Sequence, residues 1–305
     1  MKPMKGIFLL GICAMLTGLN TQAQEENWTQ EDWNKVELRS EHVAGSIHVI
    51  FGLWHGNSGV SIGQDGIFLI DDQFAPLVDK LIDTIGGISN KKIKYVINTH
   101  SHTDHIGGNE KLSKQGAVII AHDKVRENMK NDHETFMMNT PSLPGGLPVI
   151  TYSDRLSLHI NNEVAQIIHI NNAHTDNDSI IYFKGSNVIH MGDIYFTSGL
   201  PYIDTDIGGD IDGMIKAVEL AITMTNEQTK VIAGHGPVGD SEGLKHYLRM
   251  LETSRSIISN EKKRGKNIND IQENPDVLIQ SLVKPWNKNS TGGLNHFISS
   301  VYKSI

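Results

Sequence analysis

A dense run of potential metal ligands is the most informative feature of the chain: His100-Ser101-His102-Thr103-Asp104-His105. Neutral imidazole and carboxylate oxygen are both common ligands of zinc. Alternate residues of an extended segment can point the same way, so His100 and His102 could bind one ion. Asp104 and His105 lie further along and can serve a second ion. The run therefore predicts one side of a site for two metal ions.

Three more candidate ligands stand far from this run in the sequence, and each follows an apolar segment typical of a buried strand. They are His174 after residues 164–170, Asp193 after residues 188–191 and His235 after residues 230–233, just as the run itself follows residues 93–97. Because loops at one edge of a rigid sheet can converge on a common site, we expect these groups to meet there.

The candidate ligands are numerous enough for two ions. His174 would complete three protein ligands for the first ion, and His235 would do so for the second. Asp193 has two carboxylate oxygens and could bridge the pair. Three nitrogen or oxygen ligands with one open position are typical of a catalytic zinc site rather than a closed structural one. The chain is therefore expected to bind two Zn²⁺ ions for catalysis.

The elements that must hold these ligands are strands and helices in alternation. The first half predicts a hairpin of residues 59–63 and 67–71 closed by an Asp65-Gly66 turn, a helix at 77–85, strands at 93–97 and 117–121, and a helix at 122–130. The second half predicts strands at 155–160, 164–170, 179–183, 188–191 and 230–233, and a helix at 210–224. Mixed elements in both halves indicate an α/β fold in one domain, with two sheets packed face to face and helices outside.

Two further stretches have a recognisable pattern. Residues 133–148 are rich in proline and glycine and are expected to form a loop, in which Phe136-Met137-Met138 could be a flap over an apolar substrate or could simply pack the loop. Residues 241–305 are mostly helical by pattern, with breaks near Asn274-Pro275 and at residues 286–293.

Composition limits the expected partners. The 305 residues carry 27 Lys and Arg against 35 Asp and Glu, which gives a formal charge of −8 and a sequence pI near 6.0. Nucleic acid and anionic membrane both favour a basic face, so neither is an expected partner. A small-molecule substrate is expected instead.

Residues 1–23 have the pattern of a secretory signal peptide. Lys2 and Lys5 precede an apolar run at residues 7–19, and small and polar residues follow up to Ala23. We expect cleavage after Ala23, which leaves residues 24–305 as one periplasmic or secreted domain with a helical C-terminal segment. The apolar run is short for a transmembrane helix, so stable membrane insertion is not expected.

Cysteine chemistry is excluded by the cysteine count. Cys13 is the single cysteine and lies in the expected signal peptide. The mature chain would then have no disulfide, no thiolate ligand and no cysteine nucleophile. Any metal site must use histidine and carboxylate.

Several of these motifs, taken together and in order, resemble the metallo-β-lactamase superfamily. The segment from Asn98 to Asn109 contains the HxHxDH signature of that family. Four other blocks match as well: Leu69-Ile70-Asp71-Asp72, Ala173-His174-Thr175, Met191-Gly192-Asp193 and Gly234-His235-Gly236-Pro237. The resemblance covers residues 45–240.

The resemblance implies a four-layered αβ/βα sandwich and assigns a role to each ligand. His100, His102 and His174 would hold the first zinc ion, Asp104, His105 and His235 the second, with Asp193 as the bridge. Two ions about 4 Å apart can lower the pKa of a shared water to roughly 7, which supplies a nucleophile at neutral pH. Asp71 would orient a ligand histidine as a hydrogen-bond acceptor.

The chain departs from the best-known antibiotic-degrading branch of this family at two positions. That branch has a cysteine where this chain has Asp193, and a lysine for the β-lactam carboxylate where this chain has Phe196. Thr197, Ser198 or zinc itself could contact that carboxylate instead. An aspartate at this position is shared with glyoxalase II-like enzymes, lactonases and sulfur-oxidation-associated hydrolases, and residues 199–213 resemble a broad exported group, some of whose members hydrolyse β-lactams.

Several functional interpretations follow. The first is hydrolysis of a cyclic amide or ester, with a β-lactam as the best single substrate. The second is a lactonase for acyl-homoserine lactones, or a thioesterase. A non-enzymatic metal-binding protein is the alternative of another class, and an iron oxidoreductase is a further one because ligand type only biases the choice of metal. Of the remaining residues, Tyr195 could donate a hydrogen bond to substrate or pack in the core, and His122, His169 and His190 are expected to be structural.

Overall fold

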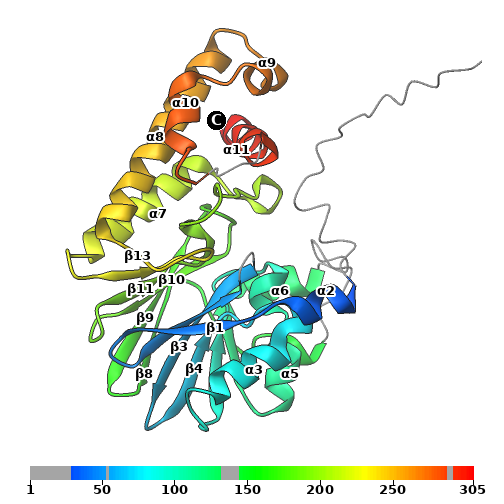
Figure 1. The fold of residues 1–305 in the computed structure, drawn as a ribbon, viewed down its shortest axis with the longest axis vertical. Helices are drawn as coiled ribbons and strands as arrows, with labels where there is room; N and C mark the ends of the chain where they lie inside the picture. Colours follow the sequence, from blue (N-terminus) through cyan, green and yellow to red (C-terminus); the bar gives the residue numbers. More distant parts are fainter. Residues whose placement is uncertain (1–28, 53–54, 132–143, 287–290) are drawn as a thin grey trace, which may run out of the picture.

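The computed structural model describes residues 29–52, 55–131, 144–286 and 291–305. Two mixed β-sheets face each other, with helices on both outer sides (Figure 1). The predicted α/β class and four-layered sandwich are therefore confirmed. The expected signal peptide and the Phe136-Met137-Met138 flap lie outside the described residues.

The first sheet has seven strands in sequence order, and the parallel pairs are β4 with β5, β5 with β6 and β6 with β7. Its strands are β1 (Arg39–Ala44), β2 (Ile47–Gly52), β3 (His55–Gly63), β4 (Gly66–Ile70), β5 (Ile93–Ile97), β6 (Val118–His122) and β7 (Ile150–Tyr152). The second sheet has six strands in the order β13-β12-β11-β10-β9-β8. They are β8 (Arg155–Ile160), β9 (Glu163–Ile170), β10 (Asp178–Phe183), β11 (Val188–His190), β12 (Lys230–Ile232) and β13 (Gly239–Asp240).

Helices cover the outer face of each sheet, and shorter helical turns lie in the loops between strands (Figure 1). In the N-terminal half they are α2 (Gln30–Lys35), η1 (Ala75–Leu77), α3 (Val78–Gly86), α4 (Thr103–Ile106), α5 (Asn109–Lys114), α6 (Asp123–Asn131) and η2 (Pro144–Gly146). In the C-terminal half they are η3 (Gly192–Ile194), η4 (Thr205–Ile207), α7 (Ile211–Met224), α8 (Ser241–Lys263), α9 (Ile268–Glu273), α10 (Val277–Val283) and α11 (Thr291–Ser304). None of the helices in the described ranges is long and apolar enough to cross a membrane.

The strand β4 shows why the centre of the sandwich is stable. Phe68 and Ile70 point into the core between the sheets, where Phe68 meets Phe183 of β10 with ring centroids 6.2 Å apart. Ile67 and Leu69 point outward and pack under α3. A strand covered on both faces reads as a continuous apolar run rather than an alternating one, as residues 67–70 do. The sheet is therefore a rigid support for the loops at its edge.

The hairpin of β3 and β4 differs from the prediction by one residue. Gly63 pairs with Gly66, so the turn residues are Gln64 and Asp65 rather than Asp65 and Gly66. Asp65 is held in the turn by the other sheet, because its carboxylate accepts from the Asn161 backbone N–H at 2.7 Å. Gly66 follows with a φ of 122°, a value that suits glycine.

Helices lie near both ends of the described chain, and they include residues for which the sequence pattern did not predict a helix. The polar residues before Val36 include α2, whose capping box joins Thr29 and Asp32 and whose Trp33 is buried. The C-terminal break was expected to extend to Gly293, but α11 already begins at Thr291. Burial of Phe297 and Val301 on α11 outweighs the low helix propensity of its glycines.

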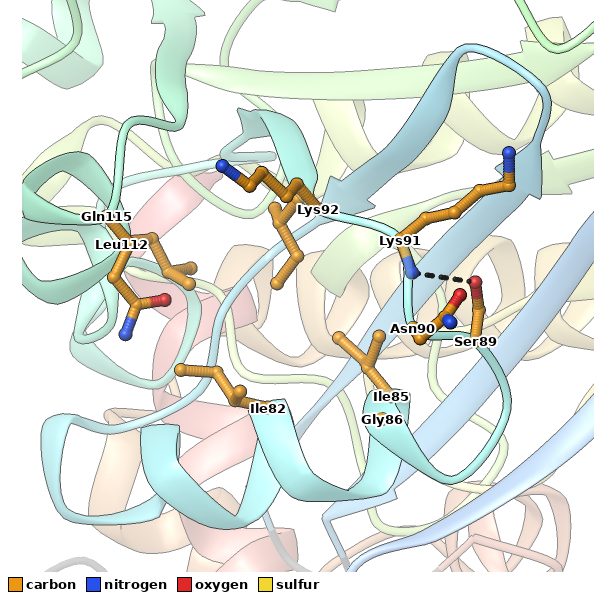
Figure 2. A pocket seen from close by; sticks show the side chains of 10 residues that line it. Ile82, Ile85, Gly86, Ser89, Asn90, Lys91, Lys92, Leu112 and Gln115 are labelled. Atoms are coloured by element: carbon orange, nitrogen blue, oxygen red, sulfur yellow. Dashed lines mark hydrogen bonds between the residues drawn. The ribbon is translucent and has the colours of Figure 1, made fainter.

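A cleft of about 340 Å³ lies between α3 and α5, at the Ile93 end of β5 (Figure 2). Its floor is apolar, with Ile82, Ile85 and Leu112, and Lys91 and Lys92 stand at its margin. The histidine run follows the opposite end of β5. This cleft is therefore separate from the candidate ligands.

The predicted structural role of His122 and His169 fits their contact across the two sheets. His122 ends β6, His169 lies in β9, and their rings stack with centroids 3.6 Å apart and an interplanar angle of 7°. Nε2 of His122 contacts the Ser153 carbonyl and Nδ1 of His169 contacts that of Asp178. Burial lowers the pKa of both side chains, and in His169 the neighbouring His122 adds to the shift.

We expect this pair to make the folded protein sensitive to mild acid. Because the pKa values are lowered in the folded state, the unfolded chain binds more protons once the pH falls below the ordinary histidine value, so stability declines. Denaturant unfolding between about pH 7 and about pH 5 should show a smaller decline for His122→Phe than for the natural protein. The same substitution at the exposed His246 is the control. Equal declines in the natural protein and His122→Phe would contradict this expectation.

Candidate metal centre

The histidine run is placed by β5 and by the short helix that follows it. Ile97 ends β5 in the core, and the backbone bends at residues 99–101 before His102, which has φ −70° and ψ 148°. The chain then turns into α4, which carries Asp104 and His105. The Asn98 side chain donates to the His105 carbonyl at 2.8 Å and so closes the loop. A bent loop followed by one helical turn thus places all four side chains in one region.

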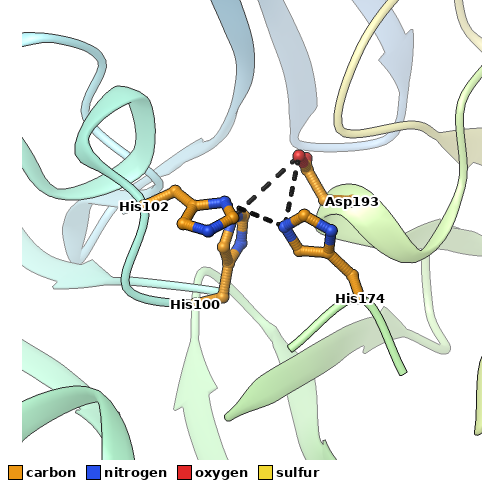
Figure 3. A group of neighbouring side chains, drawn as sticks. All are labelled: His100, His102, His174 and Asp193. Atoms are coloured by element: carbon orange, nitrogen blue, oxygen red, sulfur yellow. Dashed lines mark hydrogen bonds and ion pairs between the residues drawn. The ribbon is translucent and has the colours of Figure 1, made fainter. Parts of the chain in front are cut away.

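The first cluster contains His100, His102, His174 and Asp193, all buried (Figure 3). One possible ligand atom from each residue lies within 4.8 Å of all the others. Nε2 of His174 is 2.9 Å from Nδ1 of His102. Nε2 of His100 and Nε2 of His174 lie 3.9 and 3.7 Å from Asp193 Oδ2.

The second cluster contains Asp104, His105 and His235 and meets the same 4.8 Å limit. Asp104 Oδ2 lies 3.3 Å from His105 Nε2 and 3.4 Å from His235 Nε2. The backbone N–H of Gly56 donates to Asp104 Oδ2 at 3.1 Å, which fixes the carboxylate from the β3 side.

Asp193 lies between the two clusters. Besides its contacts with the first cluster, its Oδ2 is 3.1 Å from His235 Nε2 and its Oδ1 is 3.3 Å from His105 Nε2. It follows β11 on the turn η3, next to the strand that leads to His235. Its place between the clusters suits the bridging role that we predicted for it.

In four of the five cluster histidines, the side of the ring that faces away from the clusters is held by a hydrogen-bond acceptor. Asp71 Oδ2 lies 2.8 Å from His105 Nδ1 and also accepts from the Thr99 hydroxyl. Because that hydroxyl donates to Asp71, its oxygen is left to accept from Nδ1 of His100 at 3.0 Å. Asp71 therefore contacts one histidine directly and a second through Thr99.

These hydrogen bonds test whether the residues fit a metal. His102 and His174 are the pair of rings whose nitrogens lie closest together. The outer N–H of each ring donates to an acceptor behind it, Asp204 Oδ2 for His102 and the Tyr202 carbonyl for His174. The nitrogens that face each other at 2.9 Å therefore both carry lone pairs, and a cation between them removes that repulsion. Among the described residues, His100 Nε2, His105 Nε2 and Asp193 Oδ1 are buried without a hydrogen-bond partner. The donor set fits two metal ions.

The protonation states differ between the two clusters. Burial lowers the pKa of His174 to about 4 and that of His100 well below its ordinary value, so both rings are neutral. Burial alone would lower the pKa of His105 and His235 and raise that of Asp104 and Asp193. The mutual attraction of these four side chains outweighs burial, so both histidine values are raised and both aspartate values are lowered. Neutral imidazole and ionised carboxylate are the forms that bind metal, so metal binding at His105 and His235 would release protons.

The structure also settles the environment of the four neighbouring residues 195–198. Tyr195 is buried, and its ring packs against Tyr247 with centroids 5.1 Å apart. Phe196 is buried too and stacks on His235, with centroids 5.0 Å apart and an interplanar angle of 6°. The Thr197 hydroxyl donates to the Pro237 carbonyl at 2.6 Å. Ser198 is exposed beside the turn of Gly236.

Asp204 and Asn57 are among the residues at the site whose roles sequence reasoning missed. Asp204 holds His102 from behind, although 102 positions separate them. Asn57 donates its amide to the carbonyls of Ala233 and Gly236, on both sides of His235. Neither residue stands at a recognisable spacing from the ligands, so only the fold reveals them.

The fold and the two joined clusters define a metallohydrolase with a centre at one edge of a two-sheet sandwich. Comparison with known proteins agrees with this class. The sequence profile of the Metallo-beta-lactamase superfamily matches residues 42–252. The chain belongs to the metallo-β-lactamase superfamily and is a metal-dependent hydrolase of that superfamily.

Two curated relatives show the range of similarity. A hydroxyacylglutathione hydrolase from Pelagibacter ubique (strain HTCC1062) is 31% identical over 147 residues, which are 48% of this chain and 53% of that protein. A Metallo-beta-lactamase type 2 from Bacillus cereus is 23% identical over 267 residues, which are 80% of this chain and 97% of that protein. The chain thus matches about half the length of the first relative and nearly all of the second.

Two solved structures share the fold at low identity. The DIM-1 metallo-beta-lactamase has a TM-score of 0.59 and 20% identity and covers 72% of this chain and 98% of its own. The stereoselective inverting sec-alkylsulfatase Pisa1 from Pseudomonas sp. has a TM-score of 0.67 and 15% identity and covers 87% of this chain and 50% of its own.

Proposed function

We propose that this chain is an exported two-zinc hydrolase that opens a cyclic amide or ester, with β-lactams as the single most favoured substrate class. The observation that carries the proposal is the pair of buried ligand clusters that share Asp193. Nitrogen and oxygen ligands of this kind suit zinc. The pattern of residues 1–23 supports export.

The chemistry divides between the ions and the protein. When bound, zinc lowers the pKa of water and polarises a carbonyl as a Lewis acid. The protein orients four of the ligand rings by placing a hydrogen-bond acceptor at the ring nitrogen that faces away from the clusters, such as Asp71 for His105. Asp104 and Asp193 supply negative charge beside the histidines.

The surroundings of the centre bear on the substrate. The position of the β-lactam-binding lysine in the antibiotic-degrading branch is occupied by Phe196, which stacks on His235 and supplies no cation. The Thr197 hydroxyl is bonded to Pro237, whereas Ser198 is exposed. A β-lactam carboxylate would then be bound by Ser198 or by zinc.

Thioesters and lactones are the second candidate substrate class. The 31% identity to a hydroxyacylglutathione hydrolase over 147 residues favours a thioester, and Asp193 in place of cysteine agrees with it. A carboxylate substrate group would not be required for such a reaction.

One experiment decides between these classes. Mature protein, residues 24–305, is loaded with zinc, its metal content is measured, and it is screened against β-lactams, acyl-homoserine lactones and thioesters. We expect two zinc ions per chain and β-lactam hydrolysis that is about a hundredfold or more slower in Asp104→Asn, because one ion loses a charged ligand. Hydrolysis of thioesters or lactones alone would replace the first proposal with the second. Equal rates in Asp104→Asn and the natural protein would overturn the two-ion mechanism.

A further inference from the structure

The segment Tyr202-Ile203-Asp204 contacts two histidines of the first cluster from the side that faces away from Asp193. The Tyr202 carbonyl accepts from His174 Nδ1 at 2.7 Å, and Asp204 Oδ2 accepts from His102 Nε2 at 3.0 Å. The Asp204 backbone N–H donates to the His174 carbonyl at 2.9 Å. One short segment thus holds both rings and one backbone group of the first cluster.

His102 is the member of the first cluster that depends most on this segment. His100 and His174 direct Nε2 toward Asp193, whereas His102 directs Nδ1 into the cluster. A ring that presents Nδ1 must keep its proton on Nε2, at the far end of the ring. An acceptor at that far end selects this tautomer. Asp204 Oδ2 is such an acceptor.

Asp204 divides its two oxygens between separate tasks. Its Oδ1 caps the turn η4 by accepting from the backbone N–H groups of Asp206 and Ile207 at 3.1 and 3.2 Å. Its Oδ2 is left for His102. The turn therefore orients the carboxylate, and the carboxylate orients the ring.

The C-terminal helix α11 supports the segment from outside. The ring of Tyr202 stacks on His296 of α11 with centroids 4.5 Å apart and an interplanar angle of 7°. Ile203, the residue between Tyr202 and Asp204, is buried in the core that α11 shares with α7 and α8. The last helix of the chain is thus in contact with the segment that holds the first cluster.

We propose that Asp204 is a positioning residue that fixes His102 for metal binding, and that α11 braces it through Tyr202. The inference rests on the two ligand clusters and does not depend on which substrate is hydrolysed. The expected consequence is a difference in metal affinity, which can be measured without any substrate.

The test compares two cap substitutions that are chemically identical. Asp204→Ser keeps a side-chain oxygen that can cap η4 but removes the acceptor for His102. Asp210→Ser is the matched control, because Asp210 caps α7 by accepting from Asp212 and Gly213 and has no contact with a ligand histidine. Zinc affinity is measured by competition with a chelator. We expect Asp204→Ser to bind one of its two zinc ions about 10- to 100-fold more weakly, and Asp210→Ser to keep the natural affinity.

A spectroscopic readout separates positioning from general loosening. In zinc-loaded protein with ¹⁵N-labelled histidine, the Nε2–H proton of His102 should be visible and slow to exchange with water, and in Asp204→Ser it should exchange faster while the Nδ1–H proton of His105 does not change. Asp204→Asn offers one acceptor oxygen for two tasks and should give an intermediate zinc affinity. Unchanged zinc affinity in Asp204→Ser, or equal weakening in Asp210→Ser, would overturn the proposal, and neither outcome would bear on the substrate.

Discussion

Replacement of Asp193 with alanine should remove at least one of the two metal ions and slow hydrolysis about a thousandfold, which corresponds to roughly 4 kcal/mol of transition-state stabilisation. The expected effect is large because Asp193 contacts histidines of both clusters, at 3.1 Å for His235 and 3.7 Å for His174. Asp104, the other carboxylate of the described ligand clusters, contacts histidines of the second cluster, at 3.3 Å for His105 and 3.4 Å for His235. Metal content and the rate with the best substrate of the screen are the measurements.

A neighbouring aspartate supplies the control. Asp206 is exposed on η4 and is not part of either ligand cluster, so Asp206→Ala should keep two ions and the natural rate. A full complement of two ions in Asp193→Ala would show that Asp193 does not bridge them. A normal rate with only one ion would show that a single ion is sufficient for hydrolysis.

Much of the sandwich could be predicted from the sequence because its strands are buried and bounded by clear turns. The predicted strands 93–97 and 155–160 coincide with β5 and β8. The placement of the ligands after strand ends followed from the same reasoning, since parallel β4, β5 and β6 end at one edge of the sheet. The histidines meet because β5 in one sheet and β9 and β12 in the other end at the same edge of the sandwich, and the packing of the two sheets is encoded by apolar residues.

Other features could not be predicted because they depend on contacts between distant segments. The turn at Asp65 is fixed by Asn161 of the other sheet, which no local pattern reveals. The contact of Asp204 with His102 likewise joins a capped turn to a loop after β5. Local propensity specifies the turn η4, but only the packing of the second sheet and α11 places Asp204 behind the ring of His102. Sequence patterns thus pointed to the candidate ligands and missed Asp204, which contacts one of them.

The second large effect is expected at a glycine that carries no chemistry. Gly234 lies between β12 and His235, and a Cβ atom there would stand 1.9 Å from Asp193 Oδ1 and 2.4 Å from the Gly192 carbonyl oxygen. The backbone cannot easily move away, because the Gly234 N–H donates to the Tyr195 carbonyl at 3.0 Å and its carbonyl accepts from Asn57 at 2.6 Å. Gly234→Ala must therefore displace Asp193 or break these bonds.

We expect Gly234→Ala to lower the free energy of unfolding by about 1–3 kcal/mol and to lose bound metal. Denaturant unfolding of the metal-free protein and zinc quantification after dialysis measure the two effects separately. Gly86→Ala is the matched control: Gly86 ends α3, a Cβ atom there would meet no atom within 4 Å, and the change should be neutral or stabilise the protein by up to about 1 kcal/mol. Natural zinc content in Gly234→Ala would mean that Asp193 can move and still bind metal. Because this substitution leaves all seven candidate ligands in place, its loss of metal would show that the site depends on how closely β12 approaches η3.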